Sequence, residues 1–208
     1  MDILGLAVGP VGANCYLCWS PETAEAVIID PGAEAQRIMN LISEHKLHIK
    51  TIILTHFHFD HVMAAVAVRT ATQAPIAIHR FDAALLAKPA ELFQTFTEQR
   101  LPGIQPDILL EDGKKINFGS QSLTVIFTPG HSPGGICLYS EQSGELFSGD
   151  TLFRHGIGRT DFPGSDSNLL YNSIRTRLFT LPEATVVHPG HGPGATIGEE
   201  KRSNPFVH

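Results

Sequence analysis

The chain has 208 residues, of which 42% are hydrophobic and 17% are charged, and its formal net charge is −6. This composition excludes a disordered chain and a coiled coil, and the mild acidity with scattered Lys and Arg argues against a nucleic-acid partner. No apolar run reaches the roughly 18–20 residues that a membrane span needs, so we expect no membrane partner either.

Cysteine usage and the N-terminus predict the compartment. The three cysteines, Cys15, Cys18 and Cys137, are an odd and low number, and the N-terminus lacks a basic region typical of a signal peptide. We therefore expect a cytoplasmic protein. Cys15 and Cys18 fall on opposite sides of a predicted strand, so we interpret them as buried thiols rather than as a redox or zinc pair.

Short apolar runs alternate with turn residues in the first half of the chain. This pattern predicts strands at residues 3–8, 15–19, 26–30, 51–54 and 75–79. Apolar spacing predicts helices at residues 35–47 and 62–72. The stretch 81–106 is expected to hold one or two short helices and a loop, with Phe93 and Phe96 as anchors.

The second half is richer in strands. They are predicted at residues 115–118, 122–128, 135–140, 146–148 and 185–187. A helix is predicted over residues 168–179, with Ser165, Asp166 or Ser167 as its N-cap.

The strongest chemical signal follows the apolar strand at 51–54. It reads His56-x-His58-x-Asp60-His61. Alternate residues of an extended segment point the same way, so His56, His58 and Asp60 can converge while His61 enters a helix. Imidazole and carboxylate groups gathered at one point suit a divalent cation.

Three further candidates lie downstream: His131, Asp150 and His191. Each follows a predicted strand and is bracketed by Gly or Pro, which fix a loop and let backbone approach closely. Together with the first motif they make seven potential ligands, enough for two ions that share one carboxylate.

These motifs resemble those of the metallo-β-lactamase superfamily. Within it the chain is similar to short bacterial hydroxyacylglutathione hydrolase (glyoxalase II-like) proteins, on the strings at residues 55–61, 149–153 and 158–162 and on the ending at 198–207 with Asn204-Pro205-Phe206. The resemblance implies an α/β (α+β) fold, a four-layer αβ/βα sandwich. It would form a single domain over residues 1–208, without the helical C-terminal segment that helps longer members bind glutathione.

The resemblance also implies the ligand sets. One ion would take His56, His58 and His131, the other would take Asp60, His61 and His191, and Asp150 would bridge them. Asp60 and Asp150 would then also be catalytic, with water or hydroxide between the ions as the nucleophile. We expect two divalent ions, zinc in the first place, with iron and manganese compatible with the same ligands.

The expected substrate is a small-molecule thioester of the S-D-lactoylglutathione type. Arg159 and Asp161 match the positions where longer members carry a Lys and a Tyr that contact glutathione. Arg159 can hold a carboxylate, whereas Asp161 can pair with Arg159 or repel an anion. Two alternatives stay open: a mononuclear iron persulfide dioxygenase using His56, His131 and Asp150, and a hydrolase of another ester, a lactone or a β-lactam.

Overall fold

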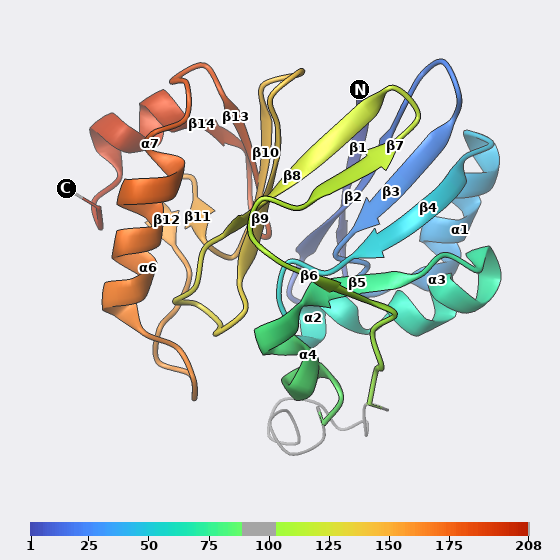
Figure 1. The fold of residues 1–208 in the computed structure, drawn as a ribbon, viewed down its shortest axis with the longest axis horizontal. Coiled ribbons are helices and arrows are strands. Elements are labelled where there is room, and N and C mark those ends of the chain that lie inside the picture. Colours follow the sequence, from blue (N-terminus) through green and yellow to red (C-terminus); the bar gives the residue numbers. More distant parts are fainter. Residues whose placement is uncertain (89–102, 208) are drawn as a thin grey trace.

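Two six-stranded sheets pack face to face, with helices on both outer sides (Figure 1). The computed structural model describes residues 1–88 and 103–207. Its layers run helix, sheet, sheet, helix, which confirms the αβ/βα sandwich expected from the sequence.

The N-terminal sheet has the strand order β1-β2-β3-β4-β5-β6. Strands β3 to β6 run parallel, while β1 and β2 are antiparallel to their neighbours. The strands are β1 (Asp2–Val8), β2 (Ala13–Trp19), β3 (Glu25–Ile29), β4 (His48–Ile53), β5 (Ile76–His79) and β6 (Ile108–Leu110).

The C-terminal sheet has the order β14-β13-β10-β9-β8-β7, and only the β10–β13 pair in it is parallel. The strands are β7 (Lys115–Phe118), β8 (Gln121–Phe127), β9 (Ile136–Ser140), β10 (Glu145–Gly149), β13 (Val186–Pro189) and β14 (Ala195–Thr196). A separate two-stranded ribbon joins β11 (Leu152–Phe153) to β12 (Gly156–Ile157).

Helices cover the outer face of each sheet. Those on the N-terminal sheet are α1 (Ala35–Glu44), α2 (Phe59–Val62), α3 (Ala65–Thr72) and α4 (Arg80–Leu86). Those on the C-terminal sheet are α6 (Ser167–Ser173), its π-helical continuation η1 (Ile174–Leu178), and α7 (Ile197–Ser203). Asp166 is the N-cap of α6 and accepts a hydrogen bond from Leu169 N at 3.0 Å, as one of the predicted alternatives had it.

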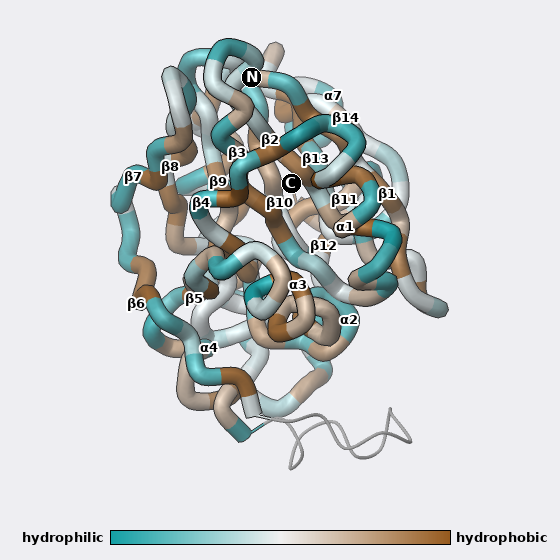
Figure 2. The backbone as a smooth tube through the Cα atoms, turned by 90° about the vertical axis from the view of Figure 1, so that its right-hand side faces the viewer, coloured by the Kyte–Doolittle hydropathy of each residue, from teal (hydrophilic) through white to brown (hydrophobic). Residues whose placement is uncertain are grey.

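Three apolar clusters match the three contacts between layers. One lies between the sheets, one under α1 to α4, and one under α6, η1 and α7. Figure 2 shows the hydrophobic stretches on the strands behind α1 and α3. Cys15 belongs to the cluster under the helices and Cys18 to the cluster between the sheets, and both are buried free thiols as predicted.

The structure corrects several predicted boundaries. The expected helix at 62–72 begins at Ala65 as α3, and Val62 instead ends the separate helix α2, because Ala64 N donates to Pro31 O at 3.0 Å and so leaves the helical ladder. Strand β4 begins at His48 rather than at residue 51, since its first half is polar but still pairs with β3. The short elements β6, β11, β12, β14 and α7 were not predicted.

The stretch 81–106 is partly described. Its first residues form most of α4, as expected, whereas Phe93 and Phe96 lie outside the described residues. Within the two described ranges, no helix has the length and apolar character that crossing a membrane requires.

Candidate metal centre

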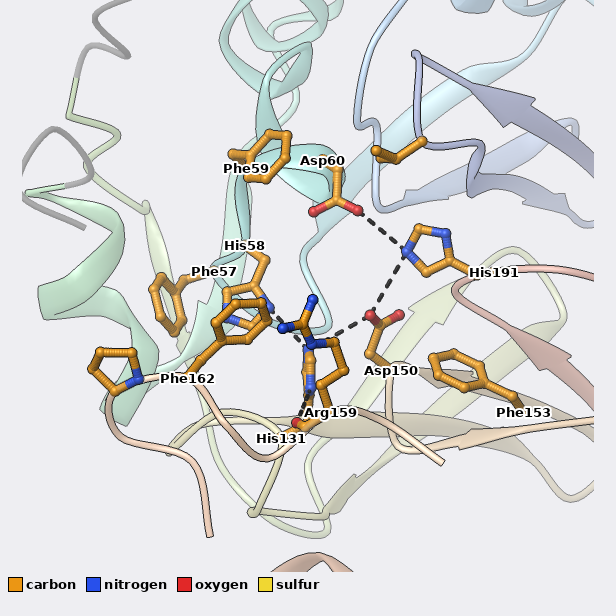
Figure 3. A pocket seen from close by; sticks show the side chains of 12 residues that line it. Phe57, His58, Phe59, Asp60, His131, Asp150, Phe153, Arg159, Phe162 and His191 are labelled. Atoms are coloured by element: carbon orange, nitrogen blue, oxygen red, sulfur yellow. Dashed lines mark hydrogen bonds and ion pairs between the residues drawn. The ribbon is translucent and has the colours of Figure 1, made fainter. Parts of the chain in front are cut away.

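All seven candidate ligands come together at one end of the sandwich, on loops that follow strands. His56 lies beyond β4 and His131 beyond β8, while Asp150 directly follows β10 and His191 follows β13. The remaining three stand at the start of α2, where His58 is an extended N-cap residue. The histidines and aspartates therefore follow strands of both sheets and meet at the same end of the sandwich. Figure 3 shows His58, Asp60, His131, Asp150 and His191 facing one another.

His56, His58 and His131 form the first group, with ligand atoms within 4.8 Å of one another. His131 Nε2 lies 2.9 Å from His58 Nδ1. The other nitrogen of His131, Nδ1, donates to the carbonyl oxygen of Arg159 at 2.8 Å. Nε2 of His131 is thereby left with a lone pair that points into the group.

His56 is fixed in the same way. The Thr55 hydroxyl donates to Asp30 Oδ2 at 2.6 Å, so it accepts from His56 Nδ1 at 3.0 Å. Nε2 of His56 is buried, and no residue in the described ranges hydrogen-bonds to it. A buried lone pair without a donor is costly unless something electropositive meets it.

Asp60, His61 and His191 form the second group, again with ligand atoms within 4.8 Å of one another. His191 Nε2 lies 3.2 Å from Asp60 Oδ2 and 3.3 Å from His61 Nε2. His61 Nδ1 donates to Asp30 Oδ2 at 3.0 Å, which again turns Nε2 towards the other members.

Asp150 lies between the two groups. Its Oδ2 is 3.5 Å from His131 Nε2 and 3.7 Å from His191 Nε2, while its Oδ1 is 3.4 Å from His61 Nε2. Oδ1 is buried and has no hydrogen-bond partner in the described structure. One carboxylate thus faces nitrogen ligands of both groups, the position that a bridging ligand would occupy.

The donor set fits metal ions. Three histidines turn Nε2 inward because their Nδ1 atoms are engaged elsewhere, and two buried candidate ligand atoms, His56 Nε2 and Asp150 Oδ1, have no hydrogen-bond partner among the described residues. Neutral imidazole and carboxylate ligands suit zinc, iron and manganese. The site is a histidine-rich cluster that could bind metals.

Electrostatics point to the same conclusion. Burial, together with the neighbouring histidines, lowers the pKa of His58 to about 3, so its ring is a neutral ligand. Burial would also lower the pKa of His61, but the carboxylates of Asp150, Asp30 and Asp60 raise it to about 10. In the metal-free protein this field keeps a second proton on His61, and a divalent cation at Nε2 would take the place of that proton.

Sequence reasoning missed Asp30, which holds two of these histidines. Oδ1 of this buried carboxylate accepts from Thr55 N at 2.7 Å, and Oδ2 accepts from the Thr55 hydroxyl and from His61 Nδ1. Its backbone is left-handed, with φ of 51°, which is uncommon for a residue other than glycine. A charged residue ending an otherwise apolar strand before Pro31-Gly32 was the available signal.

Asp82 on α4 was missed as well. It is fully buried and joins two ligand loops: Oδ2 accepts from Phe57 N at 3.2 Å and from Ser132 Oγ at 2.7 Å, and Oδ1 accepts from Gly134 N. Burial raises the pKa of Asp82 to about 6, although all three hydrogen bonds favour the charged form. No local pattern marks this role, because its partners are distant in sequence.

The loop of His191 is held from the opposite sheet. Asn14 Nδ2 donates to Pro189 O and Gly192 O, each at 2.9 Å, and Tyr16 Oη donates to Pro189 O at 2.7 Å. A side chain at Gly190 would overlap Asp150 Oδ1, so only glycine lets the loop pass so near.

The two predicted substrate-binding residues lie beside the centre. Arg159 lines a pocket of about 390 Å³ that opens onto His58, Asp60, His131, Asp150 and His191 (Figure 3). Asp161 pairs with Arg159 through two bonds of 2.9 and 2.7 Å, which is the pairing alternative weighed from the sequence.

The sequence and the fold are both similar to those of known proteins. Residues 8–191 match the family model of the Metallo-beta-lactamase superfamily. The hydroxyacylglutathione hydrolase GloC of Haemophilus influenzae is 38% identical over 209 residues, which cover 100% of this chain and 98% of that protein.

Two solved structures are also similar over almost their whole length. The B3 metallo-beta-lactamase BLEG-1 has a TM-score of 0.93 at 38% identity, with 99% of both chains covered. TTHA1623, solved in a di-iron-bound form, has a TM-score of 0.88 at 38% identity, covering 98% of this chain and 100% of that one.

Proposed function

The chain belongs to the metallo-beta-lactamase superfamily, and from this premise we propose that it is a metal-dependent hydrolase of acyl thioesters of the S-D-lactoylglutathione type. One observation carries the proposal: Asp150 lies between two complete groups of three ligands each. The similarity to a hydroxyacylglutathione hydrolase along the whole chain supports the substrate class.

The residues have distinct roles in this proposal. His56, His58 and His131 would hold one divalent ion, Asp60, His61 and His191 the other, and Asp150 both. Ions bound there would lower the pKa of water to about 7 and polarise the thioester carbonyl. We expect zinc first, with iron also supported by the di-iron form of TTHA1623.

The protein's own groups then orient the reactants. Asp60 and Asp150 line the pocket floor, where their carboxylates can align the attacking water and take up its proton. This mechanism needs no serine or cysteine nucleophile. Ser132 is buried, and its hydroxyl donates to Asp82.

The two alternative functions, a dioxygenase and a hydrolase of another substrate, differ in how much of the observed site they use. A mononuclear iron persulfide dioxygenase would need only His56, His131 and Asp150, and would leave Asp60, His61 and His191 without a role. A hydrolase of another ester, a lactone or a β-lactam would use the same ligands with a different substrate.

Hydrolysis of S-D-lactoylglutathione by the purified protein, before and after removal of metal with a chelator, tests the proposal. We expect turnover that is lost on chelation and restored by added Zn²⁺. Undiminished turnover by metal-free protein would contradict it. Oxygen consumption with glutathione persulfide, and no thioester turnover by metal-loaded protein, would favour the dioxygenase.

A further inference from the structure

The pocket above the candidate ligands is walled mainly by apolar side chains. This feature bears on the substrate class, and its interpretation rests on the proposed function. The apolar lining residues are Val11, Phe57, Phe59, Phe153, Phe162 and Pro163. Three of their rings stand next to ligand histidines, since Phe57 and Phe162 lie 4.7 and 5.4 Å from His58, and Phe153 lies 6.2 Å from His191, between ring centroids.

Arg159 is the one Lys or Arg lining this pocket within the described ranges, and Asp161 occupies the Nε/Nη2 edge of its guanidinium. Nε donates to Asp161 Oδ1 at 2.9 Å and Nη2 donates to Asp161 Oδ2 at 2.7 Å. This is the two-pronged geometry with which arginine binds a carboxylate. The guanidinium also lies over the Phe162 ring, 4.4 Å from its centroid.

The backbone of Arg159 restricts any rearrangement. Its carbonyl oxygen accepts from His131 Nδ1 at 2.8 Å, so the residue is tied to the candidate metal centre. A substrate carboxylate that binds the Nε/Nη2 edge must therefore displace Asp161, and one that binds at Nη1 instead would lie close to the negative charge of Asp161. The pair itself is exposed, with 64% and 65% of the side chains accessible, so a change in its charge should leave the fold intact.

We infer that Asp161 sets specificity within the proposed thioester hydrolase function: by neutralising Arg159, it weakens the pocket's attraction for the carboxylates of glutathione, so that glutathione thioesters are accepted but bound less tightly than thioesters with apolar, uncharged groups beside the scissile bond. The aromatic walls supply contact area for such groups. Asp161 influences specificity without contacting the substrate, through its pairing with Arg159 and through its own charge.

Binding of two probes that differ in charge tests this inference without relying on turnover. S-Hexylglutathione carries two carboxylates, and its diethyl ester carries none on an otherwise equal skeleton. Calorimetry on the metal-loaded protein should show tighter binding of the diester. Asp161→Asn should strengthen binding of the diacid by about fivefold, the upper range for an exposed ion pair, and leave the diester within about twofold.

Two further variants give the comparison its controls. Arg159→Gln should weaken binding of the diacid, because Asp161 is then unbalanced. Glu183→Gln removes the acid of another exposed pair, Glu183 with Arg202, in which the side chains are 61% and 65% accessible, and should change neither affinity. The gain in Asp161→Asn should shrink at about 0.5 M salt, where exposed charges are screened.

Rates of hydrolysis measured in parallel with thioesters of glutathione and of its diester separate the proposed function from the inference about charge selectivity. If neither thioester is hydrolysed but the binding shifts are as stated, the proposed function fails and the charge selectivity stands. The inference is overturned, and the proposed function stands, if both thioesters are hydrolysed but Asp161→Asn does not favour the diacid. In that outcome the variant either strengthens binding of diacid and diester equally or strengthens binding of neither probe.

Discussion

Replacement of Asp82 by Asn should change how stability depends on pH. The buried carboxyl joins the loop of Phe57 to the loop of Ser132 and Gly134, and Asn keeps its shape without its titration. Burial raises the pKa of Asp82 from 3.8 to about 6. A shift of about two units corresponds to about 3 kcal/mol between the two protonation states.

The sign follows from linkage. Because the folded protein holds this proton more tightly than the unfolded chain, the group stabilises the fold below about pH 4, and this contribution is lost as the pH rises through about 6. The stability of the native protein relative to Asp82→Asn should therefore fall by about 2 kcal/mol between about pH 4 and about pH 7. The variant also leaves one hydrogen-bond donor unpaired, which lowers its free energy of unfolding by about 1–3 kcal/mol. This loss is the same at every pH, so it does not alter how the stability difference changes with pH.

Urea unfolding with a chelator present, followed by circular dichroism, gives the free energy of unfolding at each pH. Asp112→Asn is the matched control. Burial would raise the pKa of Asp112, but hydrogen bonds from Phe127 N and Arg177 lower it, so this variant should lose stability relative to the native protein as the pH rises. Parallel curves for the native protein and Asp82→Asn, or divergence in the opposite direction, would show that Asp82 does not titrate in this way.

Three substitutions at the centre give simpler expectations. His58→Ala should lower metal content and abolish thioester hydrolysis with an unchanged circular dichroism spectrum; full activity in a metal-loaded variant contradicts the assignment. Asp30→Asn removes the charge and leaves one oxygen where two accept from Thr55 and His61, so His61 is held less firmly and metal affinity measured by titration should fall by roughly 10–100-fold; equal affinity would show that Asp30 has no such role. Gly190→Ala places a methyl group against Asp150, so metal analysis should find less bound metal in a folded protein, and normal content would count against the tight packing of that loop.

The sequence was informative about the candidate ligands because their signal is local. The string from His56 to His61 follows an apolar strand, and each later candidate follows another strand beside Gly or Pro. Strands with apolar alternation were predicted for the same reason. The predicted layers follow from the resemblance, and the two sheets and their outer helices confirm them.

What the sequence did not reveal depends on contacts between distant segments. Asp82 acquires its role from Ser132, which is 50 residues away, and Asp30 from His61, which is 31 residues away. The break between α2 and α3 likewise depends on the carbonyl of Pro31, which captures the amide of Ala64. No periodicity within either segment reports such partners.

Metal titration of the metal-free protein, with thioester hydrolysis followed at each addition, is the sharpest test of a centre built for two ions. Two ligand groups sharing Asp150 predict that activity rises with bound Zn²⁺ and reaches its plateau at two ions per chain. A rate of thioester hydrolysis that is already maximal without metal, or that does not rise while both ions bind, would contradict a metal-dependent mechanism at this centre.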